Sequence, residues 1–274
     1  PIDSEGGTKS EGTGILTFAI SDGKTTATTN SSFSIVFVYN WGSGSYSRVD
    51  YNPKMPGGGS AANGYAPGSS NSGFGQFLKS DGFGERVLWS NSEMGSGYSG
   101  VYVRKYNSAT NEYDSEDYIS HADIYWSDSN NRFYAGFGDG IDIDHKGERM
   151  CLWNRGERVG GKSSHGAVYV YKRNTTTNKW YKEQGGIYIQ QNANNRYFGN
   201  PGPKISGDGA HMLVPMKSYY NGSNAGVVYY YSRSGSTWSN TSSFNYGSTG
   251  DYAGVDDGGG LDSDASRALV TRNA

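Results

Sequence analysis

The segment GFGDGIDIDHKGERMCLWNRGERVGGKSSHGAVYVYKRNTTTNKWY, which runs from Gly136 to Tyr181, decides the fold class. It begins with Phe-Gly and passes through a polar turn at Asp144–Gly147 to an apolar run, Met150–Trp153. A loop leads to GAVYVY, in which valine and tyrosine alternate, and a second turn precedes Trp180. Alternation with a period of two is typical of a strand with one face against a neighbouring sheet. The segment is therefore predicted to form a unit of about four strands.

The same order of markers recurs along the chain at intervals of about 60 residues. The residues that precede the first apolar run of each copy are Thr25, Arg86, Arg149, His211 and Arg267. Phe-Gly recurs at Phe74, Phe137 and Phe198, with Ala253-Gly254 in the last copy. One small sheet cannot bury both of its faces, so such units must stack on one another. A fixed period of this length in all-strand units predicts a β-propeller of four-stranded blades.

These markers resemble the FG-GAP repeat family, whose propeller repeats also occur at the N-terminus of integrin α chains. The resemblance rests on Phe-Gly, on Ser-Asp-Gly or its remnant (Ser80–Gly82 and Gly207–Gly209), and on the strand G-(A/V)-V-Y-x-Y. It extends from Ile15 to Thr271 and implies an all-β propeller. It does not select one function, because related propellers occur in receptors, in lectins and in surface proteins of bacteria and viruses.

We expect a polar arm or linker at residues 1–14 and a propeller at residues 15–274. Its units are predicted at 15–71, 72–135, 136–196 and 197–251, with a partial unit at 252–274. The last unit would hold only two strands. The sequence therefore favours an incomplete part of a six- or seven-bladed propeller from a longer parent of roughly 360–420 residues. A four-bladed ring with a spare C-terminal hairpin is the alternative.

The composition excludes some classes of function. A net charge of −2 argues against a general nucleic-acid binder, which normally carries a basic excess. No apolar segment approaches the roughly 20 residues that a membrane span needs. The single cysteine, Cys151, lies within an apolar run and is interpreted as a buried small hydrophobe.

The FG-GAP resemblance raises the question of calcium, because the family's calcium loops resemble D-x-(D/N)-x-D-G-x-x-D. Asp142 and Asp144 match the beginning of that pattern, but Lys146 and Met150 stand where carboxylates are needed. We therefore predict no metal and no other cofactor, with these two aspartates as weak metal candidates. The Asp-Gly pairs are interpreted as hairpin turns.

Catalytic patterns are weak as well, so the sequence does not predict an enzyme. The four histidines lack zinc-site spacing. Ser163, Ser164 and His165 are neighbours in sequence, which does not make a triad. The acidic residues Asp114, Glu116 and Asp117 are interpreted as part of a solvated loop.

The loops between the second and third strands of each unit are the predicted working surface. They are expected on one face of the propeller, and their tyrosines and arginines are typical contact residues. The alternative is a solvated surface without a binding role. The predicted ligand-binding residues are Tyr98, Arg155, Arg158, Lys162, His165, Lys217, Tyr219 and Tyr220.

We predict a non-enzymatic propeller that lies outside the cell, on a cell surface or on a virion, and that recognises a glycan or a protein. One alternative is a structural subunit of a virion, fibre or surface assembly, with further copies of the chain as partners. A second alternative is a glycan hydrolase. If the chain is secreted, four sequons become candidates for N-glycosylation. They are Asn30, Asn174, Asn221 and Asn240.

Overall fold

The computed structural model describes thirteen ranges of the chain, and all of its regular elements are strands. The described residues are 14–21, 34–42, 45–51, 74–91, 100–110, 112–120, 137–157, 165–189, 198–216, 226–245, 252–254, 260–269 and 271–273. The predicted all-β class is confirmed. None of these described residues belongs to a helix that is long and apolar enough to cross a membrane.

Three antiparallel sheets have four strands each, and we call them blades 2, 3 and 4. Blade 2 holds β4 (Phe74–Ser80), β5 (Arg86–Asn91), β6 (Gly100–Asn107) and β7 (Glu112–Ser120). Blade 3 holds β8 (Phe137–Ile143), β9 (Arg149–Asn154), β10 (Ala167–Arg173) and β11 (Trp180–Ile187). Blade 4 holds β12 (Lys204–Ile205), β13 (His211–Met216), β14 (Val227–Ser234) and β15 (Thr237–Asn245).

Smaller sheets flank these three blades in the chain. Blade 1 is the three-stranded sheet of β1 (Gly14–Ser21), β2 (Ser34–Gly42) and β3 (Ser45–Tyr51). Blade 5 consists of two short pairs in the described residues. These pairs are β16 (Tyr252–Gly254) with β19 (Thr271–Asn273), and β17 (Gly260–Leu261) with β18 (Ala268–Leu269).

The register of blade 1 corrects one alignment made from the sequence. β1 pairs with β2, and the bulge at Val38/Tyr39 of β2 matches the bulge at Val103/Arg104 of β6. In this register Ile15 pairs with Asn40 as Arg86 pairs with Lys105. β1 therefore occupies the second-strand position of its blade. The choice of Thr25 as the marker residue of unit one was wrong, and Thr25 itself lies outside the described residues.

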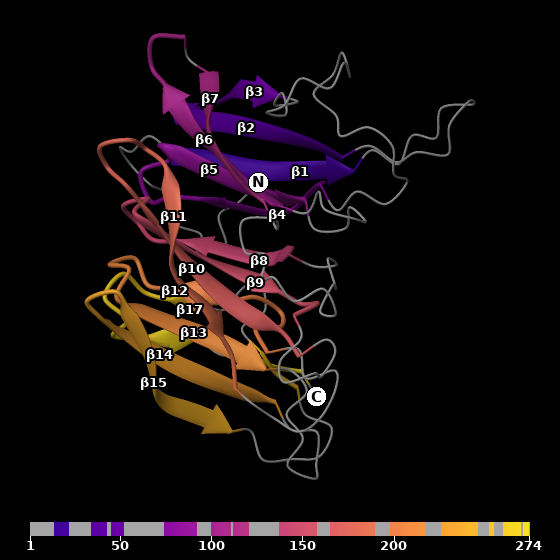
Figure 1. The fold of residues 1–274 in the computed structure, drawn as a ribbon. Coiled ribbons are helices and arrows are strands. Elements are labelled where there is room, and N and C mark those ends of the chain that lie inside the picture. The colour runs from indigo at the N-terminus through magenta and orange to yellow at the C-terminus, as the bar shows by residue number, and fades with distance from the viewer. Residues whose placement is uncertain are drawn as a thin grey trace.

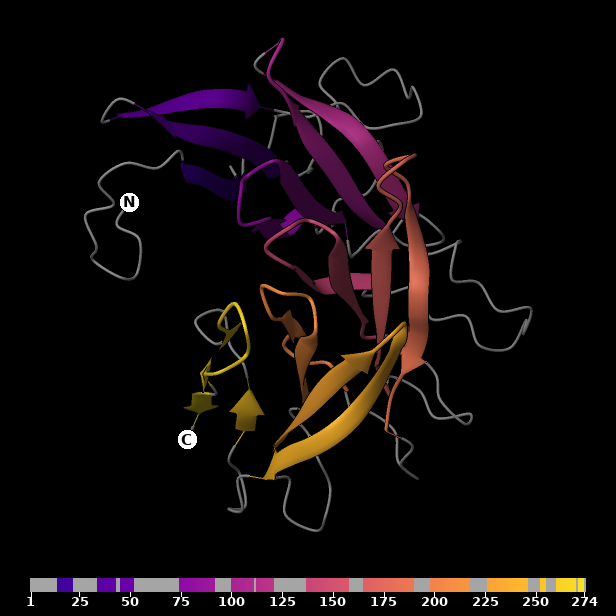
Figure 2. The same cartoon turned by 90° about the vertical axis from the view of Figure 1, so that its left-hand side faces the viewer.

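The blades follow one another around a common centre. Figure 2 shows them fanned along an arc, with the outer strands of each blade at the periphery, and Figure 1 shows the same blades stacked from blade 1 to blade 4. The first strands β4, β8, β12 and β17 contact one another in turn and line the inner side of this arc. Within the described part of the chain the arc is open, so the predicted number of blades stays a prediction.

Apolar side chains fill the spaces between successive blades. Leu88 and Val103 of blade 2 belong to one buried cluster with Leu152 of blade 3. Cys151 and Val170, on the other face of blade 3, pack in a second cluster with Met212 of blade 4. Because both faces of the blade meet a neighbour, every residue of β9 is buried, as its uninterrupted apolar run suggested. Burial also raises the pKa of the Cys151 thiol, so the predicted role as a buried hydrophobe fits its surroundings.

The Phe-Gly marker has a packing explanation. Phe137 is fully buried between blades, and Gly138 follows it with a φ of 85°. A Cβ on Gly138 would lie 3.1 Å from Cβ of Ser90 and 3.2 Å from Cγ2 of Val101, both in blade 2. The glycine therefore combines a left-handed backbone with close approach of the preceding blade, which other residues tolerate poorly.

Candidate functional site

The turns between the first and second strands form a continuous chain of contacts on the inner side of the arc. Their backbone atoms are joined from blade to blade: Gly82 N–H donates to His145 O at 3.0 Å, and His145 N–H donates to Gly207 O at 3.0 Å. Asp208 N–H continues the series to Ser263 O at 2.7 Å. These bonds fix the relative positions of the inner strands, which end just before the turns.

An aspartate holds each of the first two turns. Asp144 accepts the Glu148 N–H at 2.8 Å through Oδ1 and the Arg149 N–H at 3.1 Å through Oδ2. Asp81 accepts the Glu85 N–H in the same way at 2.8 Å. Burial raises the pKa of Asp144 to about 6, because the loss of hydration outweighs these hydrogen bonds. The interpretation of the Asp-Gly pairs as turns is therefore confirmed.

The inner strands leave a hollow of about 370 Å³ beside these turns. Lys79, Asp142 and Lys204 line it from β4, β8 and β12. They occupy equivalent positions, since their partners in the adjacent strands are Leu88, Cys151 and Leu213. His145, Gly207 and Ser263 complete the wall from the turns. The repeat therefore brings together one residue from each of several blades.

Among the described residues that line the hollow, positive side chains outnumber negative ones. Nζ of Lys79 lies 3.9 Å from Oδ1 of Asp142, while Oδ2 of Asp142 accepts the Ile205 N–H at 2.9 Å. Lys204 is 8% exposed, so two ammonium groups and one carboxylate border the space. The side chain of Asp142 is only 15% exposed, which limits the screening of these charges by water.

His145 adds a titratable group to the wall of the hollow. It is exposed, and its ring lies against Phe83 with 4.6 Å between ring centroids and 58° between ring planes. The ring passes directly over Gly82, where any larger residue would collide with it. This packing holds the imidazole beside the opening while leaving it accessible to water.

The two weak metal candidates have separate roles. Asp144 holds a turn through backbone hydrogen bonds, whereas Asp142 faces the hollow and contacts Lys79. Within the described ranges no three histidine, cysteine or acidic side chains form a cluster of metal-ligand type.

The predicted loop surface is described at only two of its eight residues. His165 is fully buried, its N–H donates to Glu157 O at 2.9 Å, and its ring meets the edge of Tyr188. Arg155 is half-buried at the base of the same loop. The structure does not bring either residue to the central hollow. The remaining six lie outside the described residues: Tyr98, Arg158, Lys162, Lys217, Tyr219 and Tyr220.

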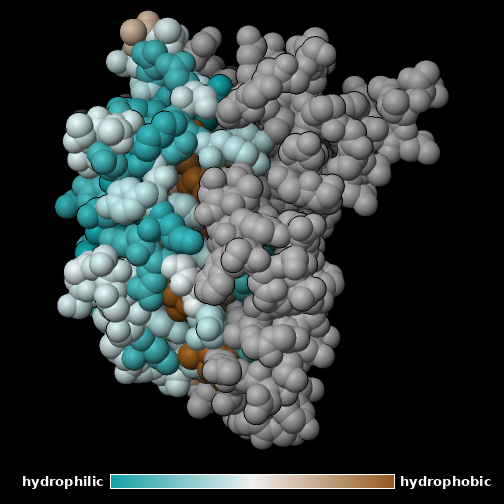
Figure 3. All heavy atoms as spheres, in the orientation of Figure 1, coloured by the Kyte–Doolittle hydropathy of each residue, from teal (hydrophilic) through white to brown (hydrophobic). Residues whose placement is uncertain are grey.

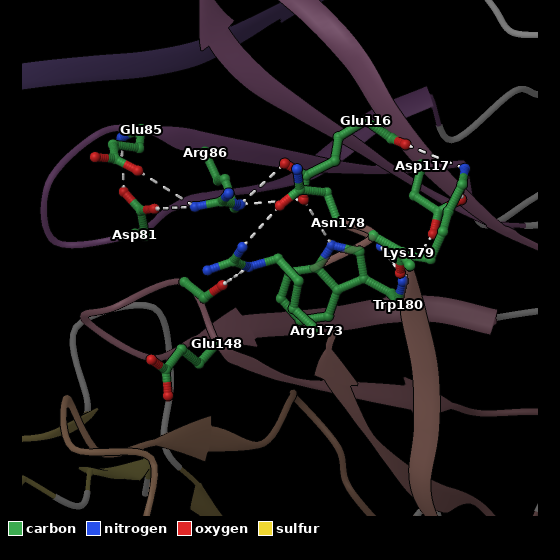
Figure 4. A network of polar contacts seen from close by, with 12 residues as sticks. Asp81, Glu85, Arg86, Glu116, Asp117, Glu148, Arg173, Asn178, Lys179 and Trp180 are labelled. Carbon is green, nitrogen blue, oxygen red and sulfur yellow. Dashed lines mark hydrogen bonds and ion pairs between the residues drawn. The ribbon is translucent and has the colours of Figure 1, made fainter. Parts of the chain in front are cut away.

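The acidic group lies on β7 and not in a loop, and only Asp114 of its three members is exposed, so the interpretation as a solvated loop was wrong for Glu116 and Asp117. Glu116 is 3% exposed at its side chain and accepts from Arg86 Nε at 3.1 Å and from Trp180 Nε1 at 3.0 Å. Asp117 accepts the Trp180 N–H at 2.9 Å and binds Lys179 Nζ at 3.0 Å. Figure 4 shows that these contacts join blade 2 to blade 3, so the two carboxylates hold the architecture.

Two of the four glycosylation candidates lie in the described residues, and both are exposed. Asn174 is in the turn between β10 and β11, where its Oδ1 accepts the Thr176 N–H at 2.9 Å. Asn240 lies on β15. Asn30 and Asn221 lie outside the described residues, and modification at all four stays a prediction.

No protein-family model matches the chain, and no curated protein matches its sequence. Several solved structures have a similar arrangement of strands. A protein from Lactobacillus plantarum has 14% identity and a TM-score of 0.44, over 77% of this chain and 50% of that one. A candidate 6-phosphogluconolactonase from Bacteroides uniformis has 10% identity and a TM-score of 0.46, over 78% of this chain and 49% of that one.

A periplasmic gluconolactonase from Pseudomonas aeruginosa has 10% identity and a TM-score of 0.43, over 95% of this chain and 76% of that one. The chain thus spans about half the length of the first two proteins. At TM-scores below 0.5 the likeness concerns the arrangement of strands and assigns no substrate to this chain.

These names correct the function predicted from the sequence. Two of the three proteins are named as lactonases, which are enzymes, and this contradicts the prediction of a non-enzymatic recognition or structural protein. The absence of a known catalytic motif was too weak a reason to exclude catalysis, because a propeller can assemble a site from separate blades.

Sequence reasoning missed Lys79 and Lys204 of the central hollow and named Asp142 only as a weak metal candidate. Lys79, Asp142 and Lys204 are more than 60 positions apart and form no local motif. The available signal was their shared place in the repeat, just before the first turn of each unit. Aligning the units on the first strand would have put these three polar residues in one column.

Proposed function

We propose that this chain is a hydrolase that acts on a small anionic sugar derivative in the central hollow. The observation that carries the proposal is the convergence of Lys79 and Lys204 on either side of Asp142. Ammonium groups in a partly enclosed space bind phosphate or carboxylate groups through charge-assisted hydrogen bonds. The hollow of about 370 Å³ is large enough for a ligand of this size.

The reaction that suits these residues is hydrolysis of a cyclic ester. His145 takes a proton from water, and the water oxygen bonds to the ester carbonyl carbon. A nearby lysine ammonium stabilises the negative charge that develops on the carbonyl oxygen. The ring carbon–oxygen bond then breaks, and the proton passes to the departing alkoxide, which leaves a hydroxy acid. Asp142 holds Lys79 toward the hollow and limits its movement.

The experiment is a direct assay of the 274-residue chain. The lactonases among the similar structures suggest the first substrates, 6-phosphogluconolactone and gluconolactone, although the proposal depends on the hollow alone. Acid release is followed in a pH-stat and compared with spontaneous hydrolysis in buffer. We expect faster hydrolysis with the protein, and a His145→Asn variant with kcat lower by roughly 100-fold or more.

Two further variants separate binding from chemistry. Lys79→Gln and Lys204→Gln should raise KM more for the phosphorylated lactone than for the neutral one, because they remove contacts to the anionic group. Lys146→Gln is the matched control, since Lys146 is exposed, adjoins His145 and does not line the hollow. Hydrolysis no faster than in buffer, or equal rates for His145→Asn and Lys146→Gln, would refute the proposal.

Other expectations from the sequence stay predictions. They include membership of the FG-GAP family, a location outside the cell or on a surface, a longer parent chain and interaction with further copies. The described strands are compatible with a propeller, but no family model matches the chain, so membership of the FG-GAP family is untested. One similar structure is named as a periplasmic protein, which is consistent with a location outside the cytoplasm.

A further inference from the structure

A second hollow of about 520 Å³ lies at the boundary between blade 3 and blade 4, away from the central one. We call it the boundary groove. Its walls come from the outer strands of blade 3 and from the hairpin turn between β14 and β15. The lining residues that carry charge or an aromatic ring are Arg149, Lys172, Tyr181, Lys182, Glu183 and Arg233.

The strand register explains why these residues meet. Arg149, Lys172 and Tyr181 are direct partners across β9, β10 and β11, so their side chains share one face of blade 3. Arg233 faces them from blade 4. Its Nε–H donates to Gly209 O at 2.9 Å and its Nη1–H donates to Gly235 O at 2.7 Å, which fixes the guanidinium at the wall of the groove.

Among the described lining residues on this face, positive side chains outnumber negative ones. Glu183 binds the buried Arg149 with Oε2 3.1 Å from Nε and Oε1 3.2 Å from Nη2, so these two charges cancel. In the described part of the chain, neither Lys172 nor Arg233 forms an ion pair with a carboxylate, although Asp208 lies close enough for Arg233 to help lower its pKa. Lys182 is the partner of Tyr171, so its side chain lies on the opposite face of the sheet, where a Cβ on Gly185 would meet both Lys182 Cδ and Tyr169. Two cations, Lys172 and Arg233, are therefore available to a ligand. In Figure 3 hydrophilic side chains cover most of the described surface on the side where β11, β14 and β15 lie in Figure 1.

The equivalent boundary between blades 2 and 3 does not share this excess. Asp114 stands at the position of Tyr181, because it is the partner of Lys105 as Tyr181 is the partner of Lys172. On the shared face, three basic residues and one acidic residue line the boundary groove, whereas the same five positions at the earlier boundary hold three basic and two acidic residues. The difference is specific to one boundary and is not a property of the repeat.

We propose that the boundary groove binds a phosphate or sulfate ester. Lys172 and the remaining Nη2 of Arg233 bind the oxyanion, as cations commonly do in phosphate sites. Tyr181 is 47% exposed, and its ring supports the organic part of the ligand. Because residues of two blades contribute, the bound anion also links blade 3 to blade 4.

The test is calorimetric titration of the 274-residue chain with p-nitrophenyl phosphate and with inorganic phosphate at low ionic strength. We expect the aryl phosphate to bind more tightly than inorganic phosphate, because Tyr181 contacts its ring. Lys172→Gln should lower the affinity for both by roughly tenfold or more. Lys182→Gln, which alters a lysine on the opposite face of the same strand pair, should leave the affinity nearly unchanged. Tyr181→Asp, which installs the residue found at the earlier boundary, should remove binding of both probes.

Matched controls keep this site distinct from the central hollow. Lys105→Gln alters the equivalent lysine at the earlier boundary and should leave the affinity unchanged. Lys79→Gln/Lys204→Gln should remove binding at the central hollow only, so titration of that variant should still show the boundary site. Unchanged affinity in Lys172→Gln, or loss of all phosphate binding in Lys79→Gln/Lys204→Gln, would overturn the proposal. Each variant is first checked for an unaltered melting temperature.

Discussion

The boundary between blades 2 and 3 and the boundary between blades 3 and 4 use one plan with different charges. At the first, Glu116 joins Arg86 to the indole of Trp180 (Figure 4). At the second, Glu183 joins Arg149 to the indole of Trp238, with 3.4 Å between Glu183 Oε2 and Trp238 Nε1. Each blade thus uses an arginine and a glutamate to hold the tryptophan of the next blade.

The neighbouring contacts show what the architecture requires. Asp117 accepts the Trp180 N–H at 2.9 Å, and Gln184, at the equivalent position, accepts the Trp238 N–H at 2.7 Å through Oε1. A charged and a neutral side chain therefore accept the same backbone hydrogen bond. Since the fold constrains hydrogen-bond acceptors and not net charge, the charge at these positions is free to differ. The positive groove at the second boundary is one result of that freedom.

The largest expected effect is on the free energy of unfolding when either of the two glutamates, Glu183 or Glu116, is replaced. Glu183→Ala leaves the buried Arg149 beside Lys172 and Arg233, so the free energy of unfolding should fall by about 3–5 kcal/mol. Glu116→Ala should cost less, about 2–3 kcal/mol, because Asp81 and Glu85 still lie within 3.9 Å and 3.4 Å of Arg86 Nη1.

Urea unfolding of both variants measures this difference. Added salt should reduce the cost of Glu183→Ala more than that of Glu116→Ala, because it screens the repulsion among the remaining cations. If both variants lose the same free energy of unfolding at every salt concentration, the charge difference between the boundaries does not affect stability.

An effect of intermediate size is expected on the pH dependence of stability when the aspartates of the two turns are replaced. The pKa of Asp144 is raised from 3.8 to about 6, so the folded protein binds more protons than the unfolded chain between these values. The stabilising contribution of this carboxyl group is complete below pH 3.8 and is lost as the pH rises through about 6. Asp144→Asn should remove about 2–3 kcal/mol of this pH dependence.

Asp81 extends that test to the earlier boundary. Burial raises its pKa as well, while hydrogen bonds and Arg86 oppose the change. Asp81→Asn should therefore alter the pH dependence in the same direction but by less. The measurement is chemical unfolding at a series of pH values. At each pH the free energy of unfolding of the variant is subtracted from that of the unaltered protein. A variant of Asp144 with the full pH dependence would contradict the assignment.

The smallest expected effects concern the contacts of the charged acceptor, Asp117, and of the neutral acceptor, Gln184. Lys179 is 65% exposed at its side chain, and its ion pair with Asp117 lies in water, so Lys179→Ala should change stability by no more than about 0.5 kcal/mol. Gln184→Ala should cost about 1 kcal/mol, because it removes both the acceptor for Trp238 N–H and the donor to Trp238 O. Thermal melts of the two variants are sufficient to rank them, and the reverse order would refute the comparison.

The sequence alone determined the local features of this protein. The strands, the apolar run of β9, the Asp-Gly turns and the blade-sized repeat all follow from patterns within one unit, because alternation and turn chemistry act over a few residues. The burial of Cys151 followed from the same run of apolar neighbours. The choice of Thr25 as the marker residue of unit one failed. The equivalent position is Ile15 of β1, ten residues earlier, and β1 carries none of the usual markers.

Only the tertiary structure decided which residues of different blades meet. Lys79, Asp142 and Lys204 converge because the inner strands pack around one centre, and no pattern within a unit reports that packing. Glu116 changed from an expected surface acid to a buried link between blades for the same reason, since its partners Arg86 and Trp180 are 30 and 64 positions away in the chain. Sites built between blades depend on the register and stacking of whole sheets, and these are set by the sum of many long-range contacts.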